Sequence, residues 1–270
     1  IVSLFIGVSQ LSLIDIFHLS DEQMNILFSS RIPRTVSILL SGSSLALSGL
    51  IMQQMMQNKF VSPTTAGTME WAKLGILLSL LFFPNGHILI KLLFAVVLSI
   101  VGTFLFVQLI NLIRVKDVIF VPLLGIMIGG ILSSFTTFVA LRTNALQSIG
   151  NWLTGNFAVI TSGRFEVLYL TIPLLILAFV FANHFTIAGM GKDFSHNLGV
   201  SYEKIIKIAL FITATLTALV VVTVGTLPFL GLIVPNIISI YRGDHLKNAL
   251  PHTLMLGAIF VLIADIIGRI

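Results

Sequence analysis

The sequence predicts an all-α membrane protein that crosses the bilayer many times. Hydrophobic residues make up 57% of the 270 residues and charged residues only 9%, whereas soluble domains carry about 25% charged residues. Apolar runs close to the ~20 residues that a helix needs to cross a bilayer recur along the whole chain. These runs lack the alternation of the ~10-residue strands of an outer-membrane barrel. Together these observations indicate a polytopic helical bundle.

Eight apolar segments are predicted to be complete spans of one transmembrane domain that covers residues 1–270. In chain order they are 35–57, 64–83, 88–113, 118–141, 166–184, 204–226, 228–241 and 249–267. Residues 1–9 have the composition of the end of an earlier span, so we expect the first and last spans of the domain to be truncated in this sequence.

Two of these spans have features that predict how they pack. In 35–57, Gly42, Ala46 and Gly49 fall on one helix face and a row of serines lies beside them, which favours close helix packing over a polar path for a solute. The segment 228–241 holds two prolines and is too short for a simple crossing. Such irregular backbone is tolerated in a membrane only where protein or a water-filled cavity covers it.

The distribution of basic residues orients the chain. If the loop around Lys59 lies inside and the loops alternate from there, nine of the fifteen Lys and Arg residues fall on the inner side, in agreement with the positive-inside rule. This places Arg31 and Arg34 outside and the polar segment 185–203 in the cytoplasm.

Motifs of enzymatic chemistry are missing from the sequence. The chain has no cysteine, its histidines show no metal-ligand spacing, and neither a nucleophile elbow nor a phosphate-binding loop occurs. We therefore expect no metal, no cofactor and no enzyme activity in this chain, and no dense basic run points to nucleic acid. Ionisable residues inside spans are sparse, which argues against a secondary transporter. Glu70 and Lys73 are expected near the inner end of their span, snorkelling to the interface.

The segment 184–205 is the longest polar stretch predicted to be cytoplasmic. Asp193 is expected to start a short helix and Gly199 to end it. An interfacial helix lying on the bilayer and a docking helix for a cytoplasmic motor both fit this composition. The segment carries an apolar stripe of Phe185, Ile187, Met190, Phe194 and Leu198 beside its polar residues.

Two further groups are candidates for roles in transport. Hydroxyl side chains in the span 118–141 could line a solute path, although hydrogen bonding back to their own helix is the more common use of such groups; they are Ser133, Ser134, Thr136 and Thr137. Asp265 and Arg269, four residues apart, are expected to form a local ion pair at an exposed helix end.

Two long motifs resemble those of a known family. They are RIPRTVSILLSGSSLALSGLIMQQMMQNKFVSPTTAGTMEWAKLG, which begins at residue 31, and GLIVPNIISIYRGDHLKNALPHTLMLGAIFVLIADIIGR, which ends at residue 269. They resemble the signatures of permease subunits of ATP-binding-cassette (ABC) importers for iron–siderophore complexes, haem and vitamin B12, over residues 10–270. Departures, among them Asn236 where the family usually has histidine, favour a branch for catecholate or petrobactin-type siderophores.

The resemblance implies a function and a set of partners. The expected fold is a vitamin B12 importer permease-like bundle with ten spans in the bacterial cytoplasmic membrane. Expected partners are a second permease subunit, identical or different, two cytoplasmic ATPase subunits that use the ATP, an extracytoplasmic siderophore-binding lipoprotein and membrane lipid. The expected function is import of a ferric siderophore by alternating access, with haem or vitamin B12 as the alternative ligand.

The resemblance also implies roles for particular residues. Arg31, Arg34 and Arg269 match the family's arginines that engage acidic residues of the binding protein. The segment 185–203 matches the loop with the ATPase-coupling helix, whose residues here are Gly191, Lys192, Asp193, Phe194, Ser195, His196, Leu198 and Gly199.

Overall fold

The described residues form a bundle built entirely from helices. The computed structural model describes residues 20–113 and 118–269, and these two ranges contain no strand. The segment 1–9, with its expected earlier span, lies outside the described residues. The elements are α2 (Asp21–Ile26), η2 (Leu27–Arg31), α3 (Ile32–Met55), α4 (Thr68–Phe82), α5 (Ile88–Leu112), α6 (Phe120–Arg142), α7 (Leu146–Leu153), η3 (Phe165–Leu170), α8 (Thr171–Val180), α9 (Ala182–Ala188), α10 (Lys192–Asn197), α11 (Tyr202–Thr223), α12 (Leu230–Arg242) and α13 (Leu246–Ile267).

Each of the eight predicted spans contains a helix, but not all of these helices are long enough to cross a bilayer. Among the described residues, five helices have the length and apolar composition of a span, or six if η3 with α8 and α9, which are bent by 59°, form one broken span. α4 has 15 residues and α12 only 13, fewer than the ~20 that a full crossing needs. The prediction of eight complete spans is therefore not confirmed, whereas the short 228–241 segment is found as expected.

The helix of the first predicted span begins well before residue 35. Ser20 and Gln23 form a capping box at its start, and the helix then continues through η2, a π-helical turn, so that Gln23–Met55 is one long element. Pro33 lies in the first turn of α3, where it has no N–H to donate to the Ser29 carbonyl four residues earlier. That carbonyl instead accepts a hydrogen bond from the Ser162 N–H at 3.1 Å.

Glycines hold the central helices close together. A Cβ on Gly49 would lie 1.8 Å from the Gly231 carbonyl oxygen of α12, and a Cβ on Gly42 would lie 2.5 Å from the Gly257 carbonyl oxygen of α13. Ala46 also contacts this site, since a Cβ on Gly257 would lie 2.6 Å from its methyl group. The small-residue face of α3 is thus used for helix packing, as the sequence predicted.

The serines beside that face are buried within the protein. Ser41 donates to the Ser37 carbonyl at 2.5 Å and Ser48 donates to the Ser44 carbonyl at 2.8 Å, and all of these side chains are inaccessible to solvent. Hydroxyls that bond back to their own helix need no water. Ser41 and Ser48 therefore belong to the packed interior of α3, whereas the Ser37 and Ser44 hydroxyls are buried without a hydrogen-bond partner among the described residues.

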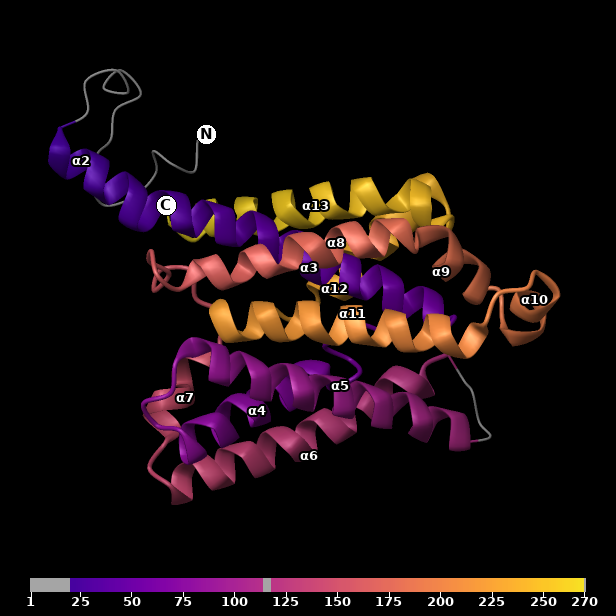
Figure 1. The fold of residues 1–270 in the computed structure, drawn as a ribbon, viewed down its shortest axis with the longest axis horizontal. Coiled ribbons are helices and arrows are strands. Elements are labelled where there is room, and N and C mark those ends of the chain that lie inside the picture. Colours follow the sequence, from indigo (N-terminus) through magenta and orange to yellow (C-terminus); the bar gives the residue numbers. More distant parts are fainter. Residues whose placement is uncertain (1–19, 114–117, 270) are drawn as a thin grey trace.

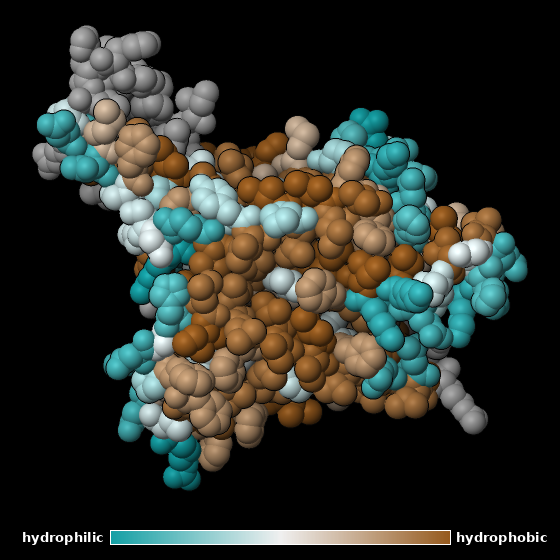
Figure 2. Space-filling model, viewed as in Figure 1, coloured by the Kyte–Doolittle hydropathy of each residue, from teal (hydrophilic) through white to brown (hydrophobic). Residues whose placement is uncertain are grey.

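The bundle has two layers that lie side by side in Figure 1. α4, α5, α6 and α7 form one layer, and α3, α8, α11 and α13 form most of the other. An apolar belt crosses the face shown in Figure 2 between two polar ends. Large hydrophobic side chains such as Ile131, Phe138 and Leu93 are exposed in the described residues. Such a belt fits a lipid environment. Following the predicted orientation, we call the end with α2 the outer end and the end with α10 the inner end.

Candidate functional site

The outer end carries a cluster in which one carboxylate binds two arginines. Asp265 Oδ1 accepts from Arg34 Nη2 at 2.6 Å and from Nε at 3.1 Å, and Asp265 Oδ2 accepts from Arg269 Nη2. The Asp265 side chain is only 4% exposed. The expected pair with Arg269 is therefore present, but the prediction that it is an exposed, purely local pair is wrong, because Arg34 of α3 shares the same buried carboxylate.

Arg31 completes this cluster. It ends the π-helical turn and is 7% exposed, and its guanidinium lies close enough to those of Arg34 and Arg269 for the like charges to repel one another. The structure thus brings together all three arginines that the resemblance assigns to docking. Three guanidinium groups and one carboxylate leave a net charge of +2, and guanidinium groups suit bidentate binding of a further carboxylate.

The inner end carries the short helix α10, which is placed by two glycines and a serine. Gly191 precedes the helix with φ of +108° and Gly199 follows it with φ of +71°, values that favour glycine. The buried Ser195 hydroxyl lies 2.8 Å from the Gly191 carbonyl and 3.2 Å from that of Ile187. Gly199 ends the helix as predicted, but the helix begins at Lys192, with Asp193 in its first turn.

The apolar stripe predicted for this segment is divided between the protein core and the surface. Phe185 is fully buried in α9, whereas Met190, Phe194 and Leu198 are 58%, 47% and 55% exposed. Lys192, Asp193 and His196 are exposed around them. α10 therefore presents apolar side chains with a charged surround, which fits both a helix lying on the bilayer and a docking surface for another protein.

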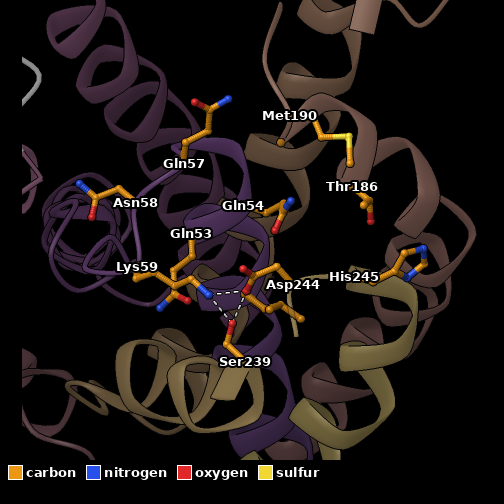
Figure 3. A pocket seen from close by; sticks show the side chains of 12 residues that line it. Gln53, Gln54, Gln57, Asn58, Lys59, Thr186, Met190, Ser239, Asp244 and His245 are labelled. Carbon is orange, nitrogen blue, oxygen red and sulfur yellow. Dashed lines mark hydrogen bonds and ion pairs between the residues drawn. The ribbon is translucent and has the colours of Figure 1, made fainter. Parts of the chain in front are cut away.

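A cavity of about 430 Å³ opens at the inner end beside α9 and the α12–α13 turn (Figure 3). Gln53, Gln54 and Gln57 of the α3 end line one wall, and Thr186 and His245 lie across from them. The close approach of α9 depends on glycine, because a Cβ on Gly189 would lie 2.2 Å from the Gln54 amide nitrogen. The end of α3 is thus in direct contact with the segment that leads into α10.

Lys59, at the rim of this cavity, connects the α3–α4 loop to the α12–α13 turn. Its ammonium group bonds Asp244 and Ser239, which also bond each other (Figure 3). The hydrogen bonds from Lys59 and Ser239 lower the pKa of Asp244 below its ordinary value. Asn236 reinforces the same connection, because its Nδ2 donates to the Lys59 carbonyl at 2.9 Å and to the Leu232 carbonyl at 2.8 Å.

The four hydroxyls proposed for a solute path differ in their surroundings. Thr137 donates to the Ser133 carbonyl at 2.8 Å, which is the back-bonding considered from the sequence. Ser134 is exposed and Ser133 is half-buried. The Thr136 hydroxyl is buried and has no hydrogen-bond partner among the described residues. The structure places these groups together on α6, but it does not test whether they contact a solute.

Some contacts at these sites were not foreseen from the sequence. The Arg34–Asp265 bond joins residues 231 positions apart, and the Asn236–Lys59 bond joins residues 177 apart. The departure at Asn236 from the usual histidine was visible, but its partner was not. Glu70 and Lys73, which are three residues apart, were expected at the membrane interface.

The comparisons with known proteins can now be added to this geometry. The FecCD transport family matches residues 1–270. The chain belongs to the FecCD transport family. It is 54% identical over 270 residues to the petrobactin import system permease protein YclN of Bacillus subtilis (strain 168), covering 100% of this chain and 85% of that protein. It is 38% identical over 269 residues to the petrobactin import system permease protein FatD of Bacillus anthracis, covering 100% and 79%.

A solved structure supports the fold of this FecCD chain. The chain matches an inward-facing conformation of a metal-chelate type ABC transporter with a TM-score of 0.83 at 24% identity, over 99% of this chain and 85% of that one. The family resemblance drawn from the two motifs is therefore confirmed. The FecCD chain is a multi-pass protein of the cytoplasmic membrane with the all-helical fold of an ABC transporter permease.

Proposed function

We propose that this FecCD chain imports the ferric complex of a petrobactin-type siderophore as the permease subunit of an ABC importer. The observation that carries the proposal is the 54% identity, along the whole chain, to a permease named for petrobactin import. A second permease named for the same siderophore is 38% identical over 269 residues. These relatives do not support the alternatives of a haem or vitamin B12 permease or of a secondary transporter.

The proposed mechanism is alternating access driven by partner subunits. Two permease subunits with ten spans each would enclose the path, two cytoplasmic ATPases would close on ATP, and a binding lipoprotein would deliver the ligand outside. Rigid-body rocking of packed helices can open such a path to one side at a time. This chain would supply the path, and no covalent step would occur in it.

The outer arginine cluster is the proposed docking site for the binding protein. Arg34 and Arg269 bind the Asp265 carboxylate, Arg31 lies near both arginines, and the group leaves an excess of positive charge at the outer end. An acidic side chain of the partner would find guanidinium groups already oriented by Asp265. Charge complementarity of this kind accelerates association and fixes orientation.

Reversal of two charges tests this docking site. Arg31→Glu with Arg34→Glu should weaken binding of the cognate binding protein to the purified importer at least about tenfold and abolish ligand-stimulated transport, because acidic groups would then face each other. Arg164→Glu, on the same side of the membrane, is the matched control and should bind normally. In the wild type, binding should also weaken as salt is raised. Unchanged affinity of the double variant and no dependence on salt would refute the docking role.

α10 is the proposed contact with the ATPase. Phe194 and Leu198 are exposed on it, and the adjacent α9 packs against Gln54 at the end of α3. A push on α10 would thus reach the central helix of the bundle through direct contact. The hydroxyls of α6, from Ser133 to Thr137, are proposed to lie along the path that this movement opens.

Iron uptake tests the function as a whole. Deletion of this permease in its host should abolish uptake of radioactive iron supplied as ferric petrobactin, and expression of the intact chain should restore it. Uptake of iron supplied as ferric citrate by an unrelated system in the same cells serves as the control and should not change. Normal uptake of ferric petrobactin without this permease would refute the proposal.

A further inference from the structure

An ion pair lies at the start of α4. Lys73 Nζ donates to Glu70 Oε1 at 2.7 Å, and the two side chains are 11% and 23% exposed. The rest of the helix after Lys73 is almost entirely apolar. The depth of this pair in the membrane can be measured against the two long helices that α4 contacts.

Contacts with α5 place the pair near the middle of that helix. Thr68 and Thr103 share a hydrogen bond of 2.8 Å between their hydroxyls, and the Trp71 ring lies on Gly102, where a Cβ would be only 2.0 Å from it. Gly102 is ten residues before the inner end of α5 at Leu112, which is about 15 Å along a helix. The hydrocarbon core is ~30 Å thick, so half of it is ~15 Å.

Contacts with α6 give the same depth independently. A Cβ on Gly129 would lie 3.5 Å from Glu70 Cγ, and Gly129 is nine residues after the start of α6 at Phe120, about 13 Å from that end. With the helix ends taken as the membrane surfaces, this depth argues against the expectation that Glu70 and Lys73 snorkel to the inner interface. The four-carbon stem of Lys73 is much shorter than the distance to either membrane surface.

A charge pair at mid-membrane depth is not explained by stability. Removing two charges from water costs more than their attraction returns in many proteins, so a buried pair is weak evidence for a stabilising role. Ionisable side chains at this depth are rare, and they face the bundle interior or a water-filled path where a solute or ion passes. Glu70 and Lys73 are also not fully enclosed, since both side chains keep some exposure.

The orientation of the two helices shows which side of α4 the pair faces. α4 and α6 run parallel, because Glu70 lies beside Gly129 and, farther along both helices, Leu77 clusters with Ala140. Each residue turns an α-helix by about 100°. Positions on the two helices can therefore be compared as angles from the line that joins their axes.

By these angles, Lys73 and the hydroxyls of α6 lie on the same side. Viewed along the helix axes, Lys73 is rotated about 60° around α4 from Glu70, which points toward α6. On α6, Gly130, Ser133 and Thr137 are rotated about 40° to 100° from Gly129, which points toward α4, and this rotation is toward the side on which Lys73 lies. A Cβ on Gly130 would meet no atom within 4 Å, so space is open there. Lys73 therefore faces the same side of the bundle as the hydroxyls of α6 that the sequence offered as a solute path.

We propose that Lys73, held by Glu70, is a solute-binding residue at mid-membrane that receives anionic oxygens of a metal chelate. The inference rests on the proposed function and adds to it the chemical class of the solute. The lysine ammonium has three N–H donors, one of which bonds Glu70. A transport site must bind its solute weakly enough to release it. The neighbouring Glu70 carboxylate weakens the attraction of Lys73 for an anion.

Uptake by the complete importer tests this site. We would reconstitute the permease with its partner permease, ATPases and binding protein in vesicles and measure ATP-driven uptake of the ferric chelate that the binding protein delivers. Lys73→Met should lower the rate of uptake about tenfold or more, the loss expected for one hydrogen bond to a charged group. Lys73→Arg should retain most of the rate because it keeps the charge.

A double variant separates solute binding from a structural role. Glu70→Gln with Lys73→Met leaves no unpaired charge in the membrane, so a purely structural pair predicts that the double variant transports like the wild type. The proposed site predicts that the double variant is as slow as Lys73→Met. Lys91→Met, which removes a lysine from the outer end of α5, is the matched control and should transport at the normal rate.

The outcomes distinguish this inference from the proposed function. Normal uptake by Lys73→Met, or recovery of uptake in the double variant, would overturn the binding role of Lys73 while leaving the importer function intact. A wild-type importer that carries no ferric chelate would overturn the proposed function itself. Retained binding-protein affinity and ATPase assembly in Lys73→Met, together with slow uptake, is the expected result.

Discussion

Asp265 joins helices from the two ends of the described chain. Its carboxylate bonds Arg34 near the start of α3 and Arg269 just after α13, and its side chain is nearly inaccessible. Removal of one member of a buried pair leaves the other charge without compensation, which costs more than the pair contributes. At the scale of single residues, Asp265 therefore decides whether the outer arginines can keep their positions.

Asp265→Asn should destabilise the protein and disorder the outer cluster. We expect a loss of about 3 kcal/mol in the free energy of unfolding, as for other broken buried pairs, visible as a lower melting temperature of the detergent-solubilised permease. Asp244→Asn, which removes a carboxylate from an exposed pair, should change the melting temperature far less. Equal melting temperatures for Asp265→Asn and the wild type would contradict the bridging role.

The Lys59–Asp244 pair should make the free energy of unfolding depend on pH. The pKa of Asp244 is lowered in the folded protein by Lys59 and Ser239. The ionised carboxylate therefore stabilises the fold above the ordinary aspartate pKa, and this contribution is lost as the pH falls through the lower, folded pKa. Because both side chains are largely exposed, the contribution should be less than about 1 kcal/mol.

Melting curves over a pH series check this expectation. The difference between the wild type and Asp244→Asn should be largest near neutral pH and should shrink as the solution is acidified below pH 4. A difference that grows with acid would contradict the lowered pKa.

At the scale of elements, close contact with α12 and α13 stabilises α3 along its length. Gly49 and Gly231 approach so closely that no side chain fits between them. Membrane helices gain little from the hydrophobic effect against one another and depend on such packing. The contact also lies near the inner half of α3, on the way to the cavity beside α10.

Gly49→Ala should separate α3 from α12. The added methyl group would overlap the Gly231 carbonyl, and overpacking of this kind costs about 1–3 kcal/mol or more. The melting temperature of the purified permease should fall accordingly. Gly130→Ala is the matched control, since a Cβ there meets open space, and it should melt like the wild type. A stable Gly49→Ala variant would show that the contact is looser than described.

α10 gives a prediction of its own. Phe194→Ala with Leu198→Ala removes two exposed apolar side chains from it. This double variant should reduce co-purification of the ATPase. Membrane insertion and the melting temperature should stay unchanged, because neither side chain is buried in this protein. Ser195→Ala should instead lower the melting temperature, since it removes the hydroxyl that bonds the α9–α10 turn. Normal ATPase recovery in the double variant would argue against coupling through α10.

Helices and their packing faces were predictable from local patterns, whereas the charged sites were not. The spacing of Gly42, Ala46 and Gly49 and the glycine that ends α10 are local signals, and the structure uses them as expected. The span predicted at 35–57 begins later than the helix that contains it, which already starts before Pro33. The helix is continuous through Pro33 because the Ser162 N–H donates to the Ser29 carbonyl, to which proline cannot donate. Ser162 is far from Pro33 in the sequence, so this contact gives no local sequence signal.

The partners of charges depend on long-range geometry in the same way. Asp265 and Arg269 are four residues apart, so a local pair was readable, but nothing in the sequence shows that Arg34 joins them. Glu70 and Lys73 looked interfacial because they stand near the start of an apolar run. Their inferred depth follows only from contacts with α5 and α6, and such contacts between distant parts of the chain leave no local signal.

At the scale of the whole molecule, the described helices form a packed, apolar body with charged groups at its two ends and one ion pair inside. Such a body can change shape, but it shows no catalytic group and no phosphate-binding loop in its sequence. As a FecCD family permease, the chain is expected to move its solute only when a binding protein delivers it and an ATPase drives the change of shape.

Reconstitution in lipid vesicles tests this claim most directly. We would prepare vesicles that contain this permease with its partner permease, ATPases and binding protein, and supply ATP on the side of the membrane where the ATPases lie. These vesicles should accumulate radioactive iron supplied as ferric petrobactin. Vesicles with the FecCD chain alone, or with the full set but a non-hydrolysable ATP analogue, should accumulate none. Robust accumulation by the isolated chain would contradict the account.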